Sequence, residues 1–158
     1  MNIVTSETST HMQSPLLAIL AGGFIAGSLD AATAFISFGW GMTRGIASGV
    51  LGSRAFTGGV AIWIFGLALH FLIAITAAAI YYLVSRRLTF LHEHFLICGI
   101  FYGVAIYLVM NLTVVPLSAV PFAVGPFSVH AMRQGLLVHM LLIGLPIAAS
   151  VRIFSKPA

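Results

Sequence analysis

The chain has 158 residues, of which 60% are hydrophobic and 6% are charged. Soluble domains carry about 25% charged residues, and the seven Lys or Arg and three Asp or Glu residues of this chain cannot cover the surface of a soluble fold. The composition therefore excludes an ordinary soluble globule, a disordered chain and a nucleic-acid-binding protein with a basic face. It indicates an integral membrane protein.

Residues 1–14 contain neither Lys nor Arg. A secretory signal begins with basic residues, so we interpret this segment as a polar tail. Residues 15–153 are predicted to form one membrane domain, and residues 154–158 a short C-terminal tail. The single cysteine, Cys98, lies in an apolar run and can form neither an internal disulfide nor a cysteine-based metal site.

The charges lie at the edges of long apolar segments, and no charged residue occurs in 55–85 or 95–132. An apolar helix of about 20 residues crosses a hydrocarbon core of about 30 Å. The segments are apolar all round, which favours helices over the alternating strands of a barrel. We expect spans at about 15–38, 59–84, 95–115 and 133–153. Short linkers make neighbouring spans antiparallel, so the expected fold is an all-α, up-down transmembrane four-helix bundle with both termini on one side.

The segment between the first two spans, residues 39–59, holds seven of the sixteen glycines together with Arg44 and Arg54. Two interpretations remain open. The segment is an interfacial helix with both arginines at lipid head groups, or it is re-entrant and lines a cavity. In the second case glycine N–H groups and the two arginines would form an anion site.

The connection between the last two spans contains Pro116, Pro121 and Pro126. Proline lacks an N–H donor and interrupts helices, so we expect irregular chain here. Its apolar character places it on the membrane surface, over the end of the bundle, or against a partner. Pro146 is expected to kink the last span.

Each expected span contains one conspicuous polar residue: Asp30, His70, Asn111 and His139. Polar groups at bilayer depth are costly and normally face the protein interior. At 1.5 Å rise per residue, all four lie between the midplane and the side opposite the termini. They predict a polar pocket that binds a substrate or ion, with Arg44 and Arg54 at its mouth.

Structural roles are the alternatives for these residues. Asp30 can form an ion pair with Arg44 or Arg54, or a hydrogen bond to His70, while His70 and Asn111 can link helices. The pairs Gly23/Gly27 and Gly99/Gly103 have the small-xxx-small spacing that lets membrane helices approach closely.

No phosphate-binding loop, His-Glu-x-x-His, Cys-x-x-Cys or serine-elbow motif occurs, and the three carboxylates are far apart in the sequence. Hydrolysis by a paired-carboxylate or serine-triad mechanism therefore has no support, and the sequence leans against an enzyme. His70 and His139 are the candidate metal ligands, and they could hold a haem by axial ligation. A depth mismatch of about 9 Å disfavours the haem, and no other cofactor is expected.

Several short strings resemble a family of small four-span bacterial inner-membrane proteins of unknown function. They include Ala26-Gly27-Ser28-Leu29-Asp30, Ala55-Phe56-Thr57-Gly58-Gly59, Leu69-His70-Phe71-Leu72-Ile73-Ala74, Met110-Asn111, Pro116-Leu117-Ser118-Ala119 and Gly144-Leu145-Pro146-Ile147-Ala148. The resemblance extends over about residues 22–152. It implies a bacterial membrane location and four spans, and nothing about chemistry.

The sequence thus favours a channel or carrier for a small solute or ion, acting as a homo-oligomer among membrane lipids. An accessory subunit of a larger membrane complex is the alternative, followed by a haem-binding redox protein. The side of the termini would hold one cation more than the other side, which favours cytoplasmic termini. The cations on the first side are Arg86, Arg87, Arg152 and Lys156, and those on the other are Arg44, Arg54 and Arg133.

Overall fold

The computed structural model describes residues 14–122 and 128–155, and within these ranges it contains helices and no strand. Four helices are long and apolar enough to cross a membrane: Pro15–Phe38, Val60–Ser85, Phe95–Leu117 and Val129–Phe154. The expected spans are confirmed, with the largest difference at the start of the fourth, residue 129 in place of 133. The N-terminal tail up to residue 13 and residues 156–158 lie outside the described part.

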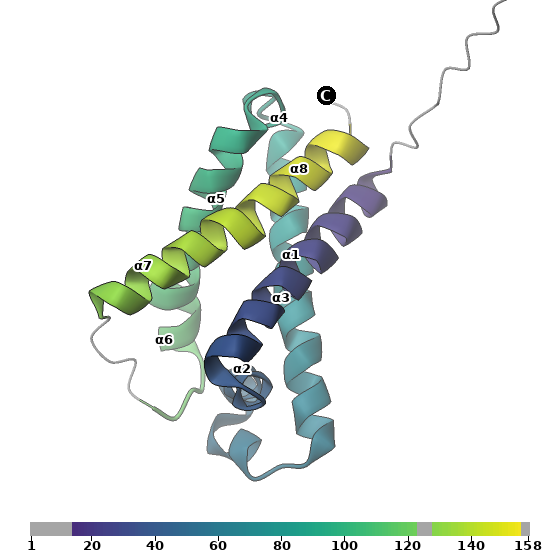
Figure 1. Cartoon of the computed structure of the whole chain (residues 1–158). Coiled ribbons are helices and arrows are strands. Elements are labelled where there is room, and N and C mark those ends of the chain that lie inside the picture. The colour runs from purple at the N-terminus through teal and green to yellow at the C-terminus, as the bar shows by residue number, and fades with distance from the viewer. Residues whose placement is uncertain (1–13, 123–127, 156–158) are drawn as a thin grey trace, which may run out of the picture.

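The two ends of the described chain meet at one end of the molecule (Figure 1). Helix α1 (Pro15–Phe38) is capped by Ser14, whose hydroxyl accepts a hydrogen bond from the Leu17 N–H. The Ser14 N–H donates to the carbonyl of Phe154 at 3.2 Å, and Phe154 ends α8 (Leu145–Phe154). The helix α4 (Phe90–Glu93) lies at the same end and contacts α8.

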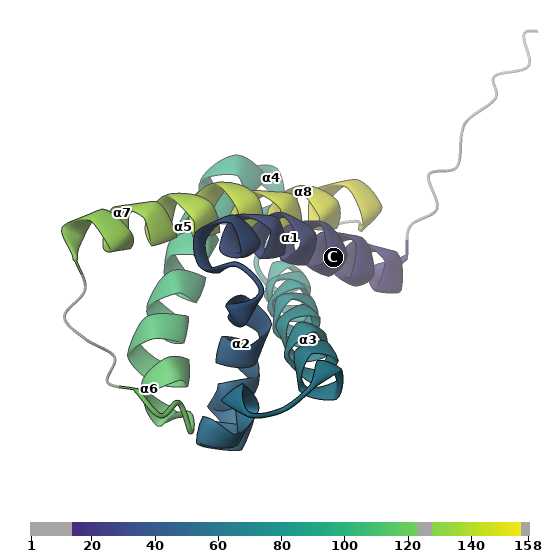
Figure 2. The same ribbon diagram turned by 60° about the horizontal axis from the view of Figure 1, so that its bottom comes forward.

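The spans form two layers that cross obliquely (Figures 1 and 2). One layer consists of α1 and the fourth span, which is built from α7 (Val129–Val138), a π-helical turn (His139–Gly144) and α8. The other contains α3 (Val60–Ser85) and α5 (Phe95–Val109). The helices of an up-down bundle run nearly aligned, whereas here α1 crosses α3, and the fourth span crosses α5.

Glycines explain how the layers approach so closely. A Cβ at Gly103 would overlap the carbonyl oxygen of His139, and a Cβ at Gly144 would overlap that of Gly99. On the other side, a Cβ at Gly23 would come within 2.7 Å of the Ile75 Cα. The close approach expected from the small-xxx-small pairs is therefore confirmed.

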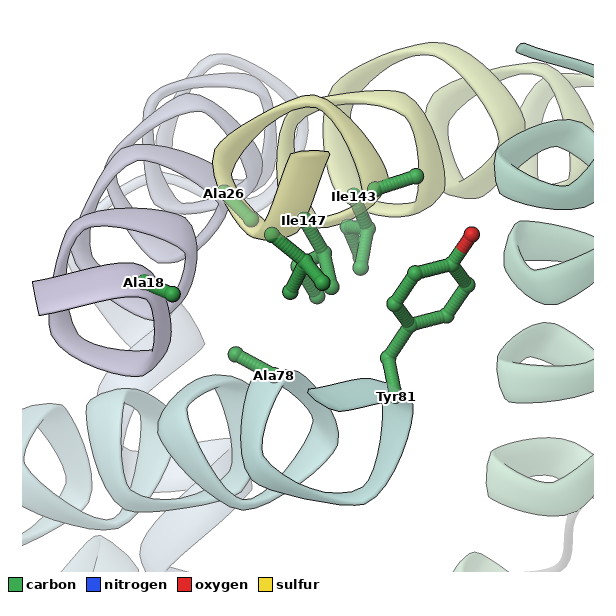
Figure 3. Packing of buried hydrophobic residues seen from close by; sticks show 8 residues of the cluster. Ala18, Ala26, Ala78, Tyr81, Ile143 and Ile147 are labelled. Atoms are coloured by element: carbon green, nitrogen blue, oxygen red, sulfur yellow. The ribbon is translucent and has the colours of Figure 1, made fainter. Parts of the chain in front are cut away.

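The packed core occupies the half of the molecule near the termini. Small side chains from α1 and α3 face Ile143 and Ile147 of the fourth span, with the ring of Tyr81 beside them (Figure 3). Tyr81 lies 4.9 Å from the ring of Tyr102, whose hydroxyl donates to the Ala77 carbonyl at 2.6 Å. These contacts join α3 to α5 at this end.

At the other end, the glycine-rich segment folds as α2 (Gly41–Leu51) and a 3₁₀ turn (Gly52–Phe56). Gly39 and Gly52 have φ 60° at the two ends of α2, a conformation that favours glycine. A Cβ at Gly66 would overlap the carbonyl oxygen of Thr43, so α2 lies directly on α3. Figure 2 shows α2 between α3 and the end of the third span.

The third connection is helical at its start. A π-helical turn (Met110–Val114) and the short α6 (Val115–Leu117) extend the third span through Pro116. Irregular chain follows as expected over the described residues 118–122. Pro126 belongs to residues 123–127, outside the described part.

Replacing Gly103 with alanine tests the close crossing of α5 and the fourth span. The added methyl group meets backbone, which cannot rotate away, so we expect Gly103→Ala to lower the free energy of unfolding by about 1–3 kcal/mol. Thermal unfolding in detergent measures the change. Gly45→Ala is the control, because no atom lies within 4 Å of its Cβ position. Equal unfolding temperatures for Gly103→Ala and the wild type would contradict the tight crossing.

Candidate functional site

A cavity of about 770 Å³ lies between the crossing layers and borders the packed core at Ala26 and Ile143. Its lining comes from α1, α2, α3, the third and fourth spans, and residues 118–122. Most lining side chains are apolar, and the volume falls within the range of about 300–1,000 Å³ that is typical of small-molecule sites.

The structure brings together the four intramembrane polar residues. Asp30, His70, Asn111 and His139 come from four different spans and all line this cavity. The side chains are far apart in the sequence, and only the crossing of the two layers gives them a common space. Their binding role remains a prediction, but their placement around one space is a finding.

Asp30 has no partner of its own for its carboxylate. Within residues 14–122 and 128–155, no side chain or backbone N–H lies within hydrogen-bond or ion-pair distance of it. The nearby Thr33 hydroxyl donates to the Asp30 backbone carbonyl at 2.8 Å. The alternatives of an ion pair with Arg44 or Arg54, or a hydrogen bond to His70, are not seen.

His70 links two spans. It is buried, and its Nε2 donates to the carbonyl oxygen of Gly27 at 2.8 Å. Gly27 allows this approach, because a Cβ there would meet Phe71 and Ala74 at 3.0–3.1 Å. The structural role expected as the alternative for His70 is thus present. The bond fixes the tautomer and leaves Nδ1 of the neutral ring as an acceptor.

His139 and Asn111 each bond to their own helix. His139 donates from Nδ1 to the Gly135 carbonyl at 2.8 Å, and Asn111 donates from Nδ2 to the Tyr107 carbonyl at 2.9 Å. The Tyr107 ring also packs edge-on to the His139 ring, with centroids 5.3 Å apart. In its neutral form the His139 ring keeps Nε2 as an acceptor, and Asn111 keeps its Oδ1 and the second N–H of Nδ2.

Both residues sit in π-helical turns. Val115 donates its N–H to Met110 and Leu145 donates to Met140, five residues back in each case. A proline follows each donor, at 116 and 146, and proline displaces the carbonyl four residues before it. The π turn relieves this clash and is frequent at functional sites. The sequence predicted a kink at Pro146, and the matching turn before Pro116 was missed although the same signal was present.

Neither Arg44 nor Arg54 is among the cavity-lining residues. Arg54 is exposed on the 3₁₀ turn, and the Nε of Arg44 is buried without a hydrogen-bond partner. The lining therefore contains a carboxylate and no Lys or Arg among the described residues. An anion site built from glycine N–H groups and these two arginines does not form in this cavity.

One side of the cavity is bordered by a contact between residues 118–122 and the segment formed by α2 and the 3₁₀ turn, which we term the mouth contact. The Ala119 N–H donates to the Gly49 carbonyl at 2.9 Å, and the rings of Phe56 and Phe122 are 6.3 Å apart. Both phenylalanines line the cavity and are exposed on their other side. Sequence patterns do not predict this pairing, because residues 118–122 are irregular and have no periodicity that indicates what they pack against.

The residues able to ligate a metal are sparse. Residues 14–122 and 128–155 contain no group of three or more His, Cys, Asp or Glu side chains placed to hold an ion. His70 and His139 each keep one ring nitrogen free of protein hydrogen bonds. A haem between them stays a prediction.

Comparisons of the chain with protein-family models, curated protein sequences and solved structures find no match. The resemblance to small four-span bacterial proteins therefore stays a prediction, and the geometry of the cavity carries the functional argument.

Cysteine labelling tests whether the cavity contains water. In a Cys98→Ala background, we expect Met110→Cys, which replaces a cavity-lining residue, to react with a charged methanethiosulfonate reagent. Leu112→Cys is the control because Leu112 is 64% exposed and lies outside the cavity lining, where we expect lipid. Thiolates form in water and not in lipid, so the rate ratio should be about tenfold or more. Equal rates measured by mass spectrometry would contradict a hydrated cavity.

Proposed function

We propose that the protein is a membrane carrier that binds a small solute in this cavity. The four apolar helices are compatible with a multi-pass membrane protein. The observation that carries the proposal is that each span places one polar side chain on the same cavity. Polar groups at bilayer depth are costly, and structural needs alone do not explain Asp30, whose carboxylate bonds to nothing in the described protein.

In this proposal α2 is re-entrant and forms a wall of the site. One side of α2 buries Thr43, Ala47 and Ser48, while Gly41 and Gly45 border the cavity. One face of α2 therefore packs against protein and another borders the cavity. An interfacial helix would instead expose one face to lipid head groups and the other to lipid tails. Irregular backbone at membrane depth is tolerated where it lines a cavity.

The mouth contact would act as the closure of the carrier. A single backbone hydrogen bond and one aromatic pair hold it, whereas glycine contacts along whole helices hold the core. Alternating access requires a weak closure on one side that can open without unfolding the spans.

Filling the cavity tests this function. Gly45 borders the cavity with no atom within 4 Å of its Cβ position, so Gly45→Phe can occupy the space without a backbone clash. In proteoliposomes we measure uptake of four labelled aromatic solutes: phenylbutylamine, phenylalanine, phenyl glucoside and phenylbutyrate. We expect the wild type to accelerate uptake of at least one of them, and Gly45→Phe to reduce that uptake about tenfold.

Gly59→Phe is the matched control for this experiment. Gly59 also has open space at its Cβ position, but it lies outside the cavity lining. We expect Gly59→Phe to transport like the wild type. Protein-independent uptake of all four solutes, or equal activity in both phenylalanine variants, would refute the carrier proposal.

We propose further that the protein lies in a bacterial inner membrane with cytoplasmic termini. Arg86, Arg87 and Arg152 lie at the end where Ser14 meets Phe154, and the positive-inside rule places such an end in the cytoplasm.

Reporter fusions test this orientation. A green fluorescent protein fused to the C-terminus should fluoresce in a bacterial host, because it matures in the cytoplasm. Alkaline phosphatase fused at the same position should be inactive, because it needs the periplasm. The reverse pattern would contradict the orientation.

A further inference from the structure

We propose that the solute is a protonated amine with an apolar body, an inference that rests on the proposed function for the site it occupies. Several polar atoms that border the cavity have no hydrogen-bond partner in the described protein, and these atoms determine which ligand the cavity can bind. Of the four polar side chains from the spans, the two histidines donate their N–H to carbonyls, Asn111 donates one of its two N–H groups in the same way, and the Asp30 carboxylate has no donor.

The two histidines and Asn111 each donate a hydrogen bond to a carbonyl of the helix backbone. His70 uses its Nε2 proton on Gly27, His139 uses its Nδ1 proton on Gly135, and Asn111 donates from Nδ2 to Tyr107. In its neutral form each imidazole keeps one acceptor nitrogen, and Asn111 keeps an acceptor oxygen and one N–H, so the free acceptors of these side chains outnumber their free donors. The site is therefore complementary to a ligand that brings N–H donors.

The charged residues of the lining also favour a cationic ligand. Asp30 is the only acidic residue in the lining, and no Lys or Arg of the described chain joins it there. An unpaired carboxylate at bilayer depth is costly until a cation or a proton meets it. An ammonium group supplies both the missing positive charge and the N–H donors, and such charge-assisted hydrogen bonds are the strong ones.

The residues that line the cavity indicate that the cation is organic and not a metal ion. No group of three or more metal-ligating side chains occurs in the described chain, whereas the walls are formed mainly by aliphatic and aromatic residues. Phe38, Phe56 and Phe122 lie along the lining, and aromatic faces attract ammonium groups while packing against an apolar body. An anionic solute would meet the Asp30 carboxylate with no compensating cation.

A matched series of ligands tests the inference on the purified full-length protein in detergent. Phenylbutylamine, phenylbutanol and phenylbutyrate share one apolar body and present a cation, a neutral group and an anion. Isothermal titration calorimetry should show the amine binding about tenfold or more tightly than the alcohol, and the acid more weakly than both. Equal affinity for amine and alcohol, or preference for the acid, would overturn the inference without any variant.

Asp30→Asn locates the effect. This variant keeps the shape of the side chain and removes its charge, so we expect the amine to fall to the affinity of the alcohol while the alcohol binds as before. Glu93→Gln removes an exposed carboxylate on α4, outside the cavity, and should change neither affinity. An amine preference that survives Asp30→Asn would overturn the assignment to this cavity.

The outcomes also separate this inference from the carrier proposal. Asp30-dependent binding of the amine without protein-dependent uptake of any solute refutes transport and supports the amine site. Uptake of phenylbutyrate or phenyl glucoside that Gly45→Phe blocks, without amine preference, supports the carrier and refutes the amine.

Discussion

The contact of glycine with bare backbone determines this architecture. In lipid, helices gain no hydrophobic energy from one another and associate through close packing instead. Gly99 and Gly103 of α5 meet Gly144 and His139 with backbone against backbone, and Gly23 meets Ile75 of α3 in the same way. Because helices touch at these crossings and diverge beyond them, the half near the termini is packed and the other half holds a cavity of about 770 Å³.

The polar residues beside the cavity are stabilised in a manner suited to a membrane. Helix carbonyls are the acceptors that a bundle always provides, and His70, His139 and Asn111 each donate to one. These bonds remove donors that would otherwise face hydrocarbon, so the free energy of placing each ring or amide at depth falls. The Asp30 side chain makes no such bond, and as a carboxylate it has no donor for a carbonyl. The same mechanism that accounts for three of the residues structurally leaves the fourth unexplained without a ligand.

The sequence predicted the spans well, because charge placement and unbroken hydropathy follow directly from the thickness of a bilayer. It also predicted which four residues share a space, since depth can be counted along a helix. It did not predict the oblique crossing of the layers, because the small-xxx-small spacing permits close contact without fixing an angle. The sequence also could not predict that the cavity presents mainly hydrogen-bond acceptors. This property depends on hydrogen bonds such as that between His70 and Gly27, which are 43 residues apart.

The position of the arginines shows why composition alone misleads about the site. Arg44 lies on the glycine-rich helix that forms a cavity wall, and a count of charges along that segment suggests an electropositive cavity. The helical repeat decides otherwise: Gly41, Gly45 and Gly49 line the cavity together with Ile46, and Arg44 lies about 160° away from Ile46 around the helix. Glycines on the lining side keep the space open, and the arginine contributes no charge to it. The cavity is left with the single negative group that α1 provides, so the chemistry of the site depends on Asp30 and not on the basic character of the whole chain.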